Sequence, residues 1–575
     1  MRDLVETIRP LLSSVMSDIG VPESDWNNLL ASSTDSAFAD VAVPCHSLSK
    51  VLRKAPNAIA DEILENLGST TEGICQVTSV NGFLNFSAEP NWLSELLQDA
   101  LTDDRLRVST EEPRVIVIDY SSPNVAKHMH VGHLRSTVIG DALNRMLTHK
   151  GHRVVAENHI GDWGTPFGML IEHLIDMGID SGPEDINLST FYSDARAKFD
   201  SNSEFASRSR ARVVRMQASE SDTIELWQML VDRSLIHFNE VYQKMGVLLS
   251  DDDLAGESKY ESALPGIVDK LAEAGLLEES DGAKVVYLEG WTNRDGDPLP
   301  LIIQKADGGY NYATSDLACI LDRIENVGSR DFLYVVGAEQ AQHFAMVFEV
   351  ARSAGFMDEG INAIHVPFGL VMGTDGKKLA SRTGGAVHLN DLLIEAVERA
   401  DAIVAEKNPS LSDEERAGVA NMLGIGAIKY ADLSTDRSNN YTFEWEKMLS
   451  FDGNTAPYLQ YAHARICSIF SKDDIDRNST RDVEITLVHE RETALGRALI
   501  GFPEALDSAC LSHSPHKLAT QLHTIAQAFA SFYEFCPVLG SEDGTRGSRL
   551  ALCDLTARTL QTGLDLLGIS SPQRM

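Results

Sequence analysis

The hydrophobic pattern changes from that of a strand to that of a helix across residues 115–146. Val115 to Ile118 form an apolar, β-branched run of the kind that makes a buried parallel strand. After a polar, glycine-containing segment, apolar residues recur at helical spacing, at Leu134, Val138, Ile139, Ala142, Leu143 and Met146. The pattern predicts a strand, a turn and a helix. In an open α/β sheet, ligands bind at the carboxyl end of such a strand.

The patterns on either side of this segment predict two further domains. In residues 1–110, a helical stripe (Leu4, Ile8, Leu11, Leu12 and Val15) precedes two alternating runs joined by Asn81-Gly82, which predicts a helix followed by a β-hairpin. Residues 111–390 carry the polar motifs described below. Residues 391–575 are helical in pattern, without strand runs comparable to 115–118. We therefore expect a small α+β domain, an α/β domain and an all-α domain.

Length and composition agree with several soluble domains. A chain of 575 residues is too long for one core, and no apolar run approaches the roughly 20 residues that a membrane span needs. Nothing in residues 1–20 suggests export. The seven cysteines are scattered without a C-x-x-C pair, which argues against zinc and favours reduced thiols in the cytoplasm. The net charge of −36 is unfavourable for steering a nucleic acid, and we interpret it as a solvated surface.

The turn before the helix carries chemistry suited to a nucleotide. Gly132 lets the backbone approach a ligand closely, and His130 and His133 flank it where the helix begins. A helix N-terminus favours phosphate, and two imidazoles there can donate hydrogen bonds to phosphoryl oxygens as charge develops. The tetrapeptide H-x-G-H can also arise by chance, but Pro123-Asn124 and the position between strand and helix favour function.

This segment, S-S-P-N-V-A-K-H-M-H-V-G-H-L-R-S-T, resembles the nucleotide-binding motif of class I aminoacyl-tRNA synthetases in the form found in arginyl-tRNA synthetases. The resemblance continues through residues 158–168, 303–316, 368–385 and 453–465 and the final R-M, and is looser in the first hundred residues and around 180–220. It implies a Rossmann-like, doubly wound parallel-sheet catalytic domain (111–390). A small α+β N-terminal domain that contacts tRNA (1–110) and an all-α anticodon-binding bundle (391–575) would flank it.

A second segment departs from the pattern of this family. Residues 378–382 read K-L-A-S-R where class I enzymes have K-M-S-K-S, so Ser381 replaces the second lysine. Lys127 is the substitute that the resemblance suggests. The resemblance implies catalytic roles for Lys127, Lys378 and the two histidines, and ATP binding by Gly132, His130, His133, Met372, Lys378 and Arg382.

Two aspartates and a tyrosine are candidates for binding a guanidinium group. Tyr312 and Asp316 are four residues apart and would share a helix face, while Asp119 ends the first strand. Carboxylates are the preferred partners of a guanidinium, although Asp316 could equally be a helix cap. The resemblance implies that these three residues hold the arginine side chain. It assigns Asn124 and Gln340 to the α-amino end, with Gln342 nearby as an alternative, and adds His130 to the arginine-binding set.

Aromatic and basic residues in the helical region are candidates for binding RNA. Tyr458, Tyr461 and Arg465 are spaced to share one helix face, where they could stack on splayed bases or form a core stripe. Four arginines in residues 208–215 could contact an acceptor stem or form a solvated face. The resemblance places Tyr458, Tyr461, Arg465, Tyr533 and Met575 at the tRNA.

The resemblance implies a complete reaction, in which L-arginine is activated with ATP and Mg²⁺ and transferred to tRNA(Arg). It implies no zinc and no other metal site, no contact with membranes, and a cytoplasmic monomer. Two alternatives stay open: a class I synthetase for a different amino acid, and a catalytically silent paralogue that only binds tRNA, which the replacement of the second lysine by Ser381 would allow.

Overall fold

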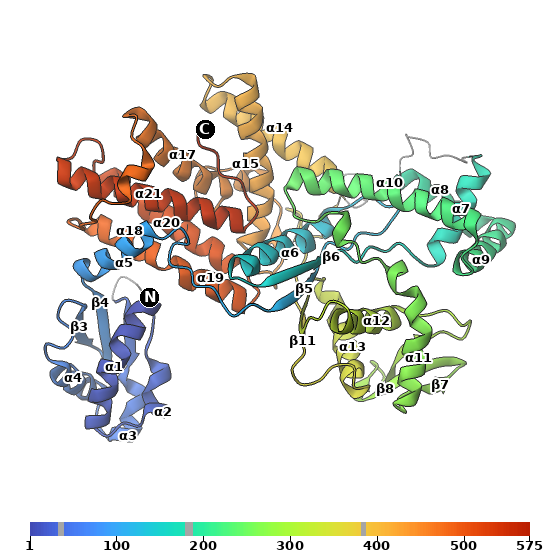
Figure 1. Ribbon diagram of the computed structural model, residues 1–575, viewed down its shortest axis with the longest axis horizontal. Helices are drawn as coiled ribbons and strands as arrows, with labels where there is room; N and C mark the ends of the chain where they lie inside the picture. The colour runs from blue at the N-terminus through green and yellow to red at the C-terminus, as the bar shows by residue number, and fades with distance from the viewer. Residues whose placement is uncertain (33–38, 179–187, 381–386) are drawn as a thin grey trace. The chain divides into compact units, whose positions relative to one another are not determined.

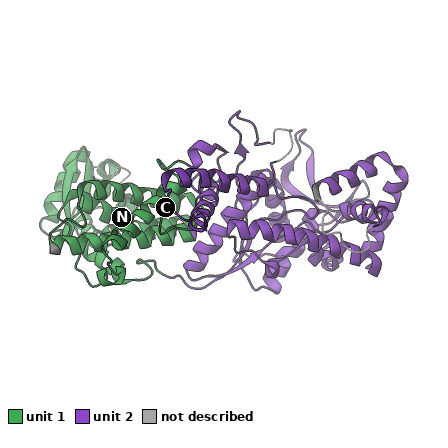
Figure 2. Ribbon diagram, turned by 90° about the horizontal axis from the view of Figure 1, so that it is seen from above, with its two compact units in different colours: residues 1–109, 450–565, 570–575 green, residues 110–449, 566–569 purple. Residues whose placement is uncertain are grey.

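The computed structural model describes residues 1–32, 39–178, 188–380 and 387–575 (Figure 1). The chain divides into two compact units, shown in different colours in Figure 2. One contains residues 1–109, 450–565 and 570–575, and the other contains residues 110–449 and 566–569. These units follow packing contacts, and the three domains expected from the sequence, divided near 110 and 390, stay a prediction.

A parallel sheet forms the centre of the second unit. Its strands lie in the order β11-β10-β5-β6 and are all parallel, with bounds β5 Val115–Asp119, β6 Arg153–Glu157, β10 Asp331–Tyr334 and β11 Asn362–His365. The chain leaves β5 for β6 on one side and later returns to β10 on the other. A crevice therefore opens between the carboxyl ends of β5 and β10, at the switch point where α/β sheets bind ligands. The predicted α/β fold is confirmed.

Helix α6 (Val131–His149) connects β5 to β6 and packs against both strands. All the apolar residues in its predicted stripe are buried. Gly140 is required for this packing, because a Cβ atom there would lie 2.3 Å from Cβ of Tyr120, just after β5. The start of α6 is thereby held beside the end of the strand.

Three further groups of elements complete the second unit (Figure 1). A helical insertion follows β6 and contains α7 Thr165–Asp176, α8 Leu188–Ser201, α9 Ser203–Gln217 and α10 Ser221–Met245. Next come α11 Leu264–Glu273, an antiparallel sheet of β7 Glu278–Ser280, β8 Ala283–Thr292 and β9 Pro298–Gln304, then α12 Tyr312–Glu325 and α13 Ala341–Ser353. The last elements are β12 Val371–Met372, α14 Leu389–Lys407, α15 Asp413–Leu433, β13 Tyr441–Thr442 and α16 Trp445–Met448. The pair β12–β13 was not predicted, because a two-residue strand leaves no periodic pattern.

The four arginines of residues 208–215 lie on α9, and three of them bind carboxylates. Arg208 pairs with Asp176, Arg212 with Glu172 and Arg215 with Glu220. Arg208 is exposed, whereas Arg212 is buried, so these arginines are held in ion pairs and do not form a wholly solvated face.

The first unit combines the beginning and the end of the chain. Its antiparallel sheet has the order β1-β2-β4-β3, with bounds β1 Ala31–Ser32, β2 Val41–Pro44, β3 Cys75–Val80 and β4 Phe83–Ala88. Asn81 and Gly82 both have positive φ, 51° and 77°, so the predicted N-G hairpin turn is present. The helices are α1 Arg2–Asp18, α2 Glu23–Trp26, α3 Ser49–Leu52, α4 Pro56–Leu67, α5 Pro90–Thr102, α17 Ala456–Lys472, α18 Glu490–Ile500, α19 Phe502–Leu511, α20 His516–Phe535 and α21 Asp543–Leu566.

Candidate active site

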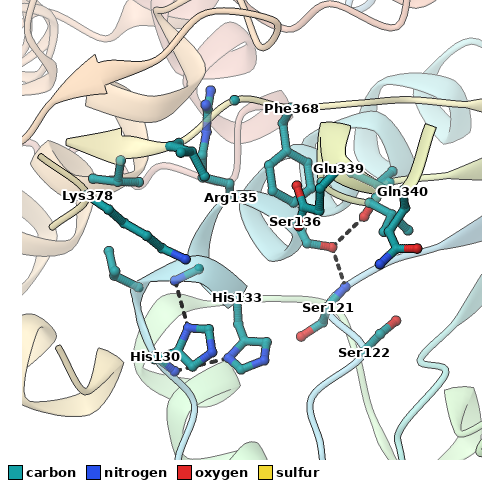
Figure 3. Close-up of a pocket in the computed structure, with 18 of the residues that line it drawn as sticks. Ser121, Ser122, His130, His133, Arg135, Ser136, Glu339, Gln340, Phe368 and Lys378 are labelled. Carbon is teal, nitrogen blue, oxygen red and sulfur yellow. Dashed lines mark hydrogen bonds between the residues drawn. The ribbon is translucent and has the colours of Figure 1, made fainter. Parts of the chain in front are cut away.

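A cavity of about 360 Å³ opens at the carboxyl ends of β5 and β10. Polar residues from several segments line it, among them Ser122, Asn124, His130, His133, Gln340 and Lys378. Lys378 and Gln340 reach toward the start of α6 from opposite sides (Figure 3). The sequence-predicted turn is therefore one wall of a cavity whose other walls come from residues more than 200 positions away.

The two histidines form a reciprocal cap at the start of α6. Nδ1 of His130 accepts a hydrogen bond from the backbone N–H of Gly132 at 3.0 Å, and Nδ1 of His133 accepts one from the backbone N–H of His130 at 3.0 Å. Gly132 is needed here, since a Cβ atom would lie 2.7 Å from the His130 ring. In both rings Nδ1 is the acceptor, so a neutral imidazole carries its proton on Nε2. The cap thus presents two Nε2–H donors.

Burial keeps both imidazoles neutral. It lowers the pKa of His130, with further lowering from the nearby charges of Lys378 and Lys127. Burial likewise lowers the pKa of His133, to about 3, and His130 and Lys127 contribute to this shift. The site therefore supplies hydrogen-bond donors and a helix N-terminus rather than two imidazolium charges.

This pKa shift predicts acid sensitivity of the fold. The pKa of His133 is about 3 in the folded chain and ~6.5 in an unfolded one, so the unfolded chain takes up the proton first as pH falls. The stabilisation that comes from keeping His133 neutral is fully present above pH ~6.5 and is lost progressively as the pH falls toward 3. Between pH 7.5 and 5, protonation of His133 should lower the free energy of unfolding of the wild type by up to about 2 kcal/mol. Replacing His133 with Gln should remove this part of the pH dependence. The thermal midpoint of the variant, measured at both pH values, should fall less than that of the wild type.

The turn between β5 and α6 adopts a strained backbone. Ser121, Ser122 and Ala126 have φ values of 75°, 50° and 59°, which non-glycine residues rarely adopt. Ser136 stabilises this turn, because its Oγ accepts a hydrogen bond from Ser121 N at 2.9 Å and donates one to Val335 O at 2.7 Å (Figure 3). Ser136 thereby joins β5 to β10 at the switch point. Ser136 cannot be recognised from the sequence, because a serine inside a helix carries no distinctive signal.

The two lysines that were predicted to take part in catalysis have different surroundings. Lys378 lines the cavity, whereas Nζ of Lys127 lies 4.5 Å from the centre of the Tyr192 ring on α8. Met372 is on β12 and forms an isolated bridge with Lys378, so it lies beside the lining without belonging to it. Ser381 and Arg382 lie outside the described residues.

Another cation at the cavity, Arg135, is already paired. It is 1% exposed, bonds to Asp432 at 3.1 Å and donates to the carbonyl oxygen of Asn439 at 2.9 Å. These contacts hold α6 against α15. Glu339 also lines the cavity, and no sequence motif points to it.

The predicted guanidinium partners differ in how they are held. The carboxylate of Asp119 binds Arg323 at 2.7 Å and Ser122 Oγ at 3.1 Å. Arg323 is fully buried on α12 and also binds Glu157 at 2.7 Å. A charged side chain of the protein itself therefore occupies one oxygen of Asp119.

Tyr312 and Asp316 are both on α12, as their spacing predicted, and are more open than Asp119. Tyr312 is 72% exposed at the first position of the helix. Asp316 is partly exposed, and its Oδ2 lies 2.5 Å from Nε2 of His343 on α13. Asn124 and Gln340, predicted at the α-amino end of the substrate, both line the cavity. Asp119, Tyr312 and Asp316, like residues 158–164, are not part of this lining.

Comparisons with known proteins cover nearly the whole chain. Residues 96–445 match the model of the class I (R) tRNA synthetase catalytic domain, residues 459–575 the DALR anticodon binding domain, and residues 6–88 the arginyl tRNA synthetase N terminal domain. An arginine–tRNA ligase of Thermobifida fusca is 49% identical, with 94% of each chain covered. The chain belongs to the arginyl-tRNA synthetase family. Two solved structures of arginyl-tRNA synthetases are each 26% identical to this chain and align over 99% of it. The Plasmodium falciparum structure has a TM-score of 0.84, with 99% of its own chain aligned. The Thermus thermophilus structure has a TM-score of 0.77, with 100% of its chain aligned.

In this arginyl-tRNA synthetase family member, the residues predicted at the anticodon partly converge. Arg465 on α17 lies over the Tyr461 ring at 4.6 Å and over the Tyr533 ring of α20 at 5.3 Å, and donates to Tyr461 Oη at 3.0 Å. Both tyrosines are exposed, so these three residues form a surface cluster and not a core stripe. Tyr458 faces His523 instead. The tail that ends in Met575 is held against α17, since His463 Nδ1 donates to the carbonyl oxygen of Pro572 at 3.0 Å.

Within the described ranges, no group of three or more His, Cys, Asp or Glu side chains is arranged to hold a metal ion. No helix among these residues is long and apolar enough to cross a membrane.

Proposed function

We propose that this protein is an arginine–tRNA ligase that activates L-arginine with ATP and esterifies it to a terminal ribose hydroxyl of tRNA(Arg). The observation that carries the proposal is the pair of neutral imidazoles at the start of α6, lining a cavity at the switch point of the sheet. Membership of the arginyl-tRNA synthetase family supports arginine as the amino acid. We take ATP to enter as its magnesium complex, with the metal as part of the substrate.

The first step is an in-line displacement at phosphorus. A carboxylate oxygen of arginine attacks the α-phosphorus of ATP, the bond from this phosphorus to the bridging oxygen breaks, and pyrophosphate leaves with that electron pair. Charge grows on the phosphoryl oxygens during this step. The Nε2–H groups of His130 and His133 and the N-terminus of α6 are placed to stabilise it, because fixed donors need no reorganisation.

Cations assist the departure of pyrophosphate. Lys378 lines the cavity and lowers the pKa of His130, so its charge reaches the start of α6. Lys127 also acts on both histidines, and we propose that it supplies the charge that Ser381 cannot. In the second step, a ribose hydroxyl of tRNA attacks the activated carbonyl carbon, loses its proton, and AMP leaves. No protein nucleophile takes part.

The arginine side chain is recognised chiefly by Asp316 in this proposal. Asp119 already shares one oxygen with Arg323, whereas Asp316 binds only an imidazole among its described partners. Tyr312 begins the same helix, and its exposed ring is accessible to a substrate. Asn124 and Gln340 bind the α-amino end from the cavity lining.

Arginine-dependent charging of tRNA by the purified protein tests the proposal. We expect charging with arginine, and ATP–pyrophosphate exchange with arginine when tRNA is present. Strong exchange with another amino acid and none with arginine would identify a different class I synthetase. Normal tRNA affinity without any charging would identify a silent paralogue.

The cluster of Tyr461, Arg465 and Tyr533 provides a separate prediction for tRNA. We propose that this cluster stacks on unpaired anticodon bases, because its aromatic faces and guanidinium are exposed together. Arg465→Ala should raise the KM for tRNA about 10-fold, on the scale of one lost stacking contact. Lys472→Ala removes one positive charge from the exposed end of the same helix and is the matched control. Equal effects of the two variants would mean that only net charge matters.

A further inference from the structure

Helices α12 and α13 place His343 against the proposed guanidinium carboxylate. Nε2 of His343 lies 2.5 Å from Oδ2 of Asp316, and the two side chains are 25% and 19% exposed. His343 is in the first turn of α13, and the N-cap residue of that helix, Gln340, lines the cavity. An edge-to-face contact with Phe344, with ring centres 5.4 Å apart, fixes the imidazole.

We infer that His343 is a positioning residue for arginine recognition, acting through Asp316; this inference rests on the proposed function. The imidazole holds one carboxylate oxygen and orients the other, Oδ1, toward the substrate guanidinium. The imidazole Nε2 can carry an N–H donor that holds Oδ2 and leaves Oδ1 for the guanidinium. At Asp119 the corresponding partner is the guanidinium of Arg323.

The hydrogen bond is not needed to hold the two helices together. Apolar side chains of both helices, including Leu317 and Ile320 of α12 and Phe344 and Val347 of α13, are buried in the same core cluster. A partly exposed polar pair adds little to stability by comparison. Loss of His343 should therefore leave the fold intact and change the freedom of the Asp316 carboxylate.

Three substitutions of His343 distinguish the loss of its hydrogen-bond donor from the loss of its side-chain volume. Gln places an amide N–H₂ near the position of the imidazole Nε2, Asn is too short to reach Asp316, and Leu removes the donor altogether. We expect His343→Leu and His343→Asn to raise the KM for arginine roughly 10-fold, on the scale of a lost hydrogen bond to a charged group. The ATP KM and kcat should change less than about twofold, and His343→Gln should recover most of the arginine KM.

A double-mutant cycle tests whether His343 acts through Asp316. Within Asp316→Ala, the further change His343→Leu should have no effect on kcat/KM for arginine, because the group it positions is absent. Additive losses, equal effects on the KM for ATP and arginine, or equal behaviour of the Gln and Asn variants would overturn the positioning role.

The same assays separate this inference from the proposed function. A wild-type protein that charges arginine while His343→Leu and His343→Asn keep its KM would overturn the positioning role alone. A wild-type protein that activates a different amino acid and not arginine would overturn the proposed function, and the positioning role with it.

Discussion

Replacing Asp316 with alanine is expected to raise the KM for arginine about 100-fold, with little change in the KM for ATP. The carboxylate is partly buried beside His343, in a place where a guanidinium would lose much of its hydration. Removing the partner of a desolvated cation costs about 3 kcal/mol, which is a factor of ~100 in affinity. Initial rates of tRNA charging, with each substrate varied in turn, give the two KM values.

Two further variants control this prediction. Asp316→Asn keeps the shape and removes the charge, so it should resemble the alanine variant if charge decides recognition. Glu325→Ala removes an exposed carboxylate from the last turn of the same helix and should leave both KM values unchanged. A parallel rise in the KM for ATP would instead show that Asp316 is structural.

Replacing His133 with alanine is expected to lower kcat for arginine activation by roughly 100-fold or more. Its Nε2–H is one of two fixed donors at the start of α6, and removal of one such donor commonly costs this much in the transition state. The KM for ATP should change far less, because the donor acts mainly on charge that develops during the reaction. Pyrophosphate exchange with arginine and tRNA present measures this step directly.

The structural role of His133 needs its own control. Nδ1 of His133 caps the backbone N–H of His130, so alanine could also loosen the start of α6. Thr148→Ala, at the exposed far end of the same helix, gives the background expected from a neutral change. His133→Gln retains a side-chain N–H group and should recover part of kcat. An unchanged kcat in the alanine variant, with its fold intact by circular dichroism, would remove His133 from the mechanism.

Part of the site could be predicted from local sequence. The histidines, Gly132 and the lysine before them lie within seven residues, and the strand-to-helix pattern places them at one turn. Tyr312 and Asp316 share a helix for the same reason, since their spacing is one helical turn. Spacing alone did not predict which side chains of a helix face come together. Tyr458 has the spacing of Tyr461 and Arg465 but packs beside His523, because α20 supplies a neighbour that the sequence of α17 does not reveal.

The sequence by itself determined that a parallel strand leads through a glycine turn into a helix that begins between two histidines, because hydrophobic period and turn residues are properties of adjacent positions. Only the tertiary structure decided which carboxylate stays available to a substrate. Arg323 reaches Asp119 across 204 positions of the chain, and His343 reaches Asp316 across 27. Side chains so far apart meet only when strands and helices pack, so pairings that neutralise or orient a charge leave no local pattern.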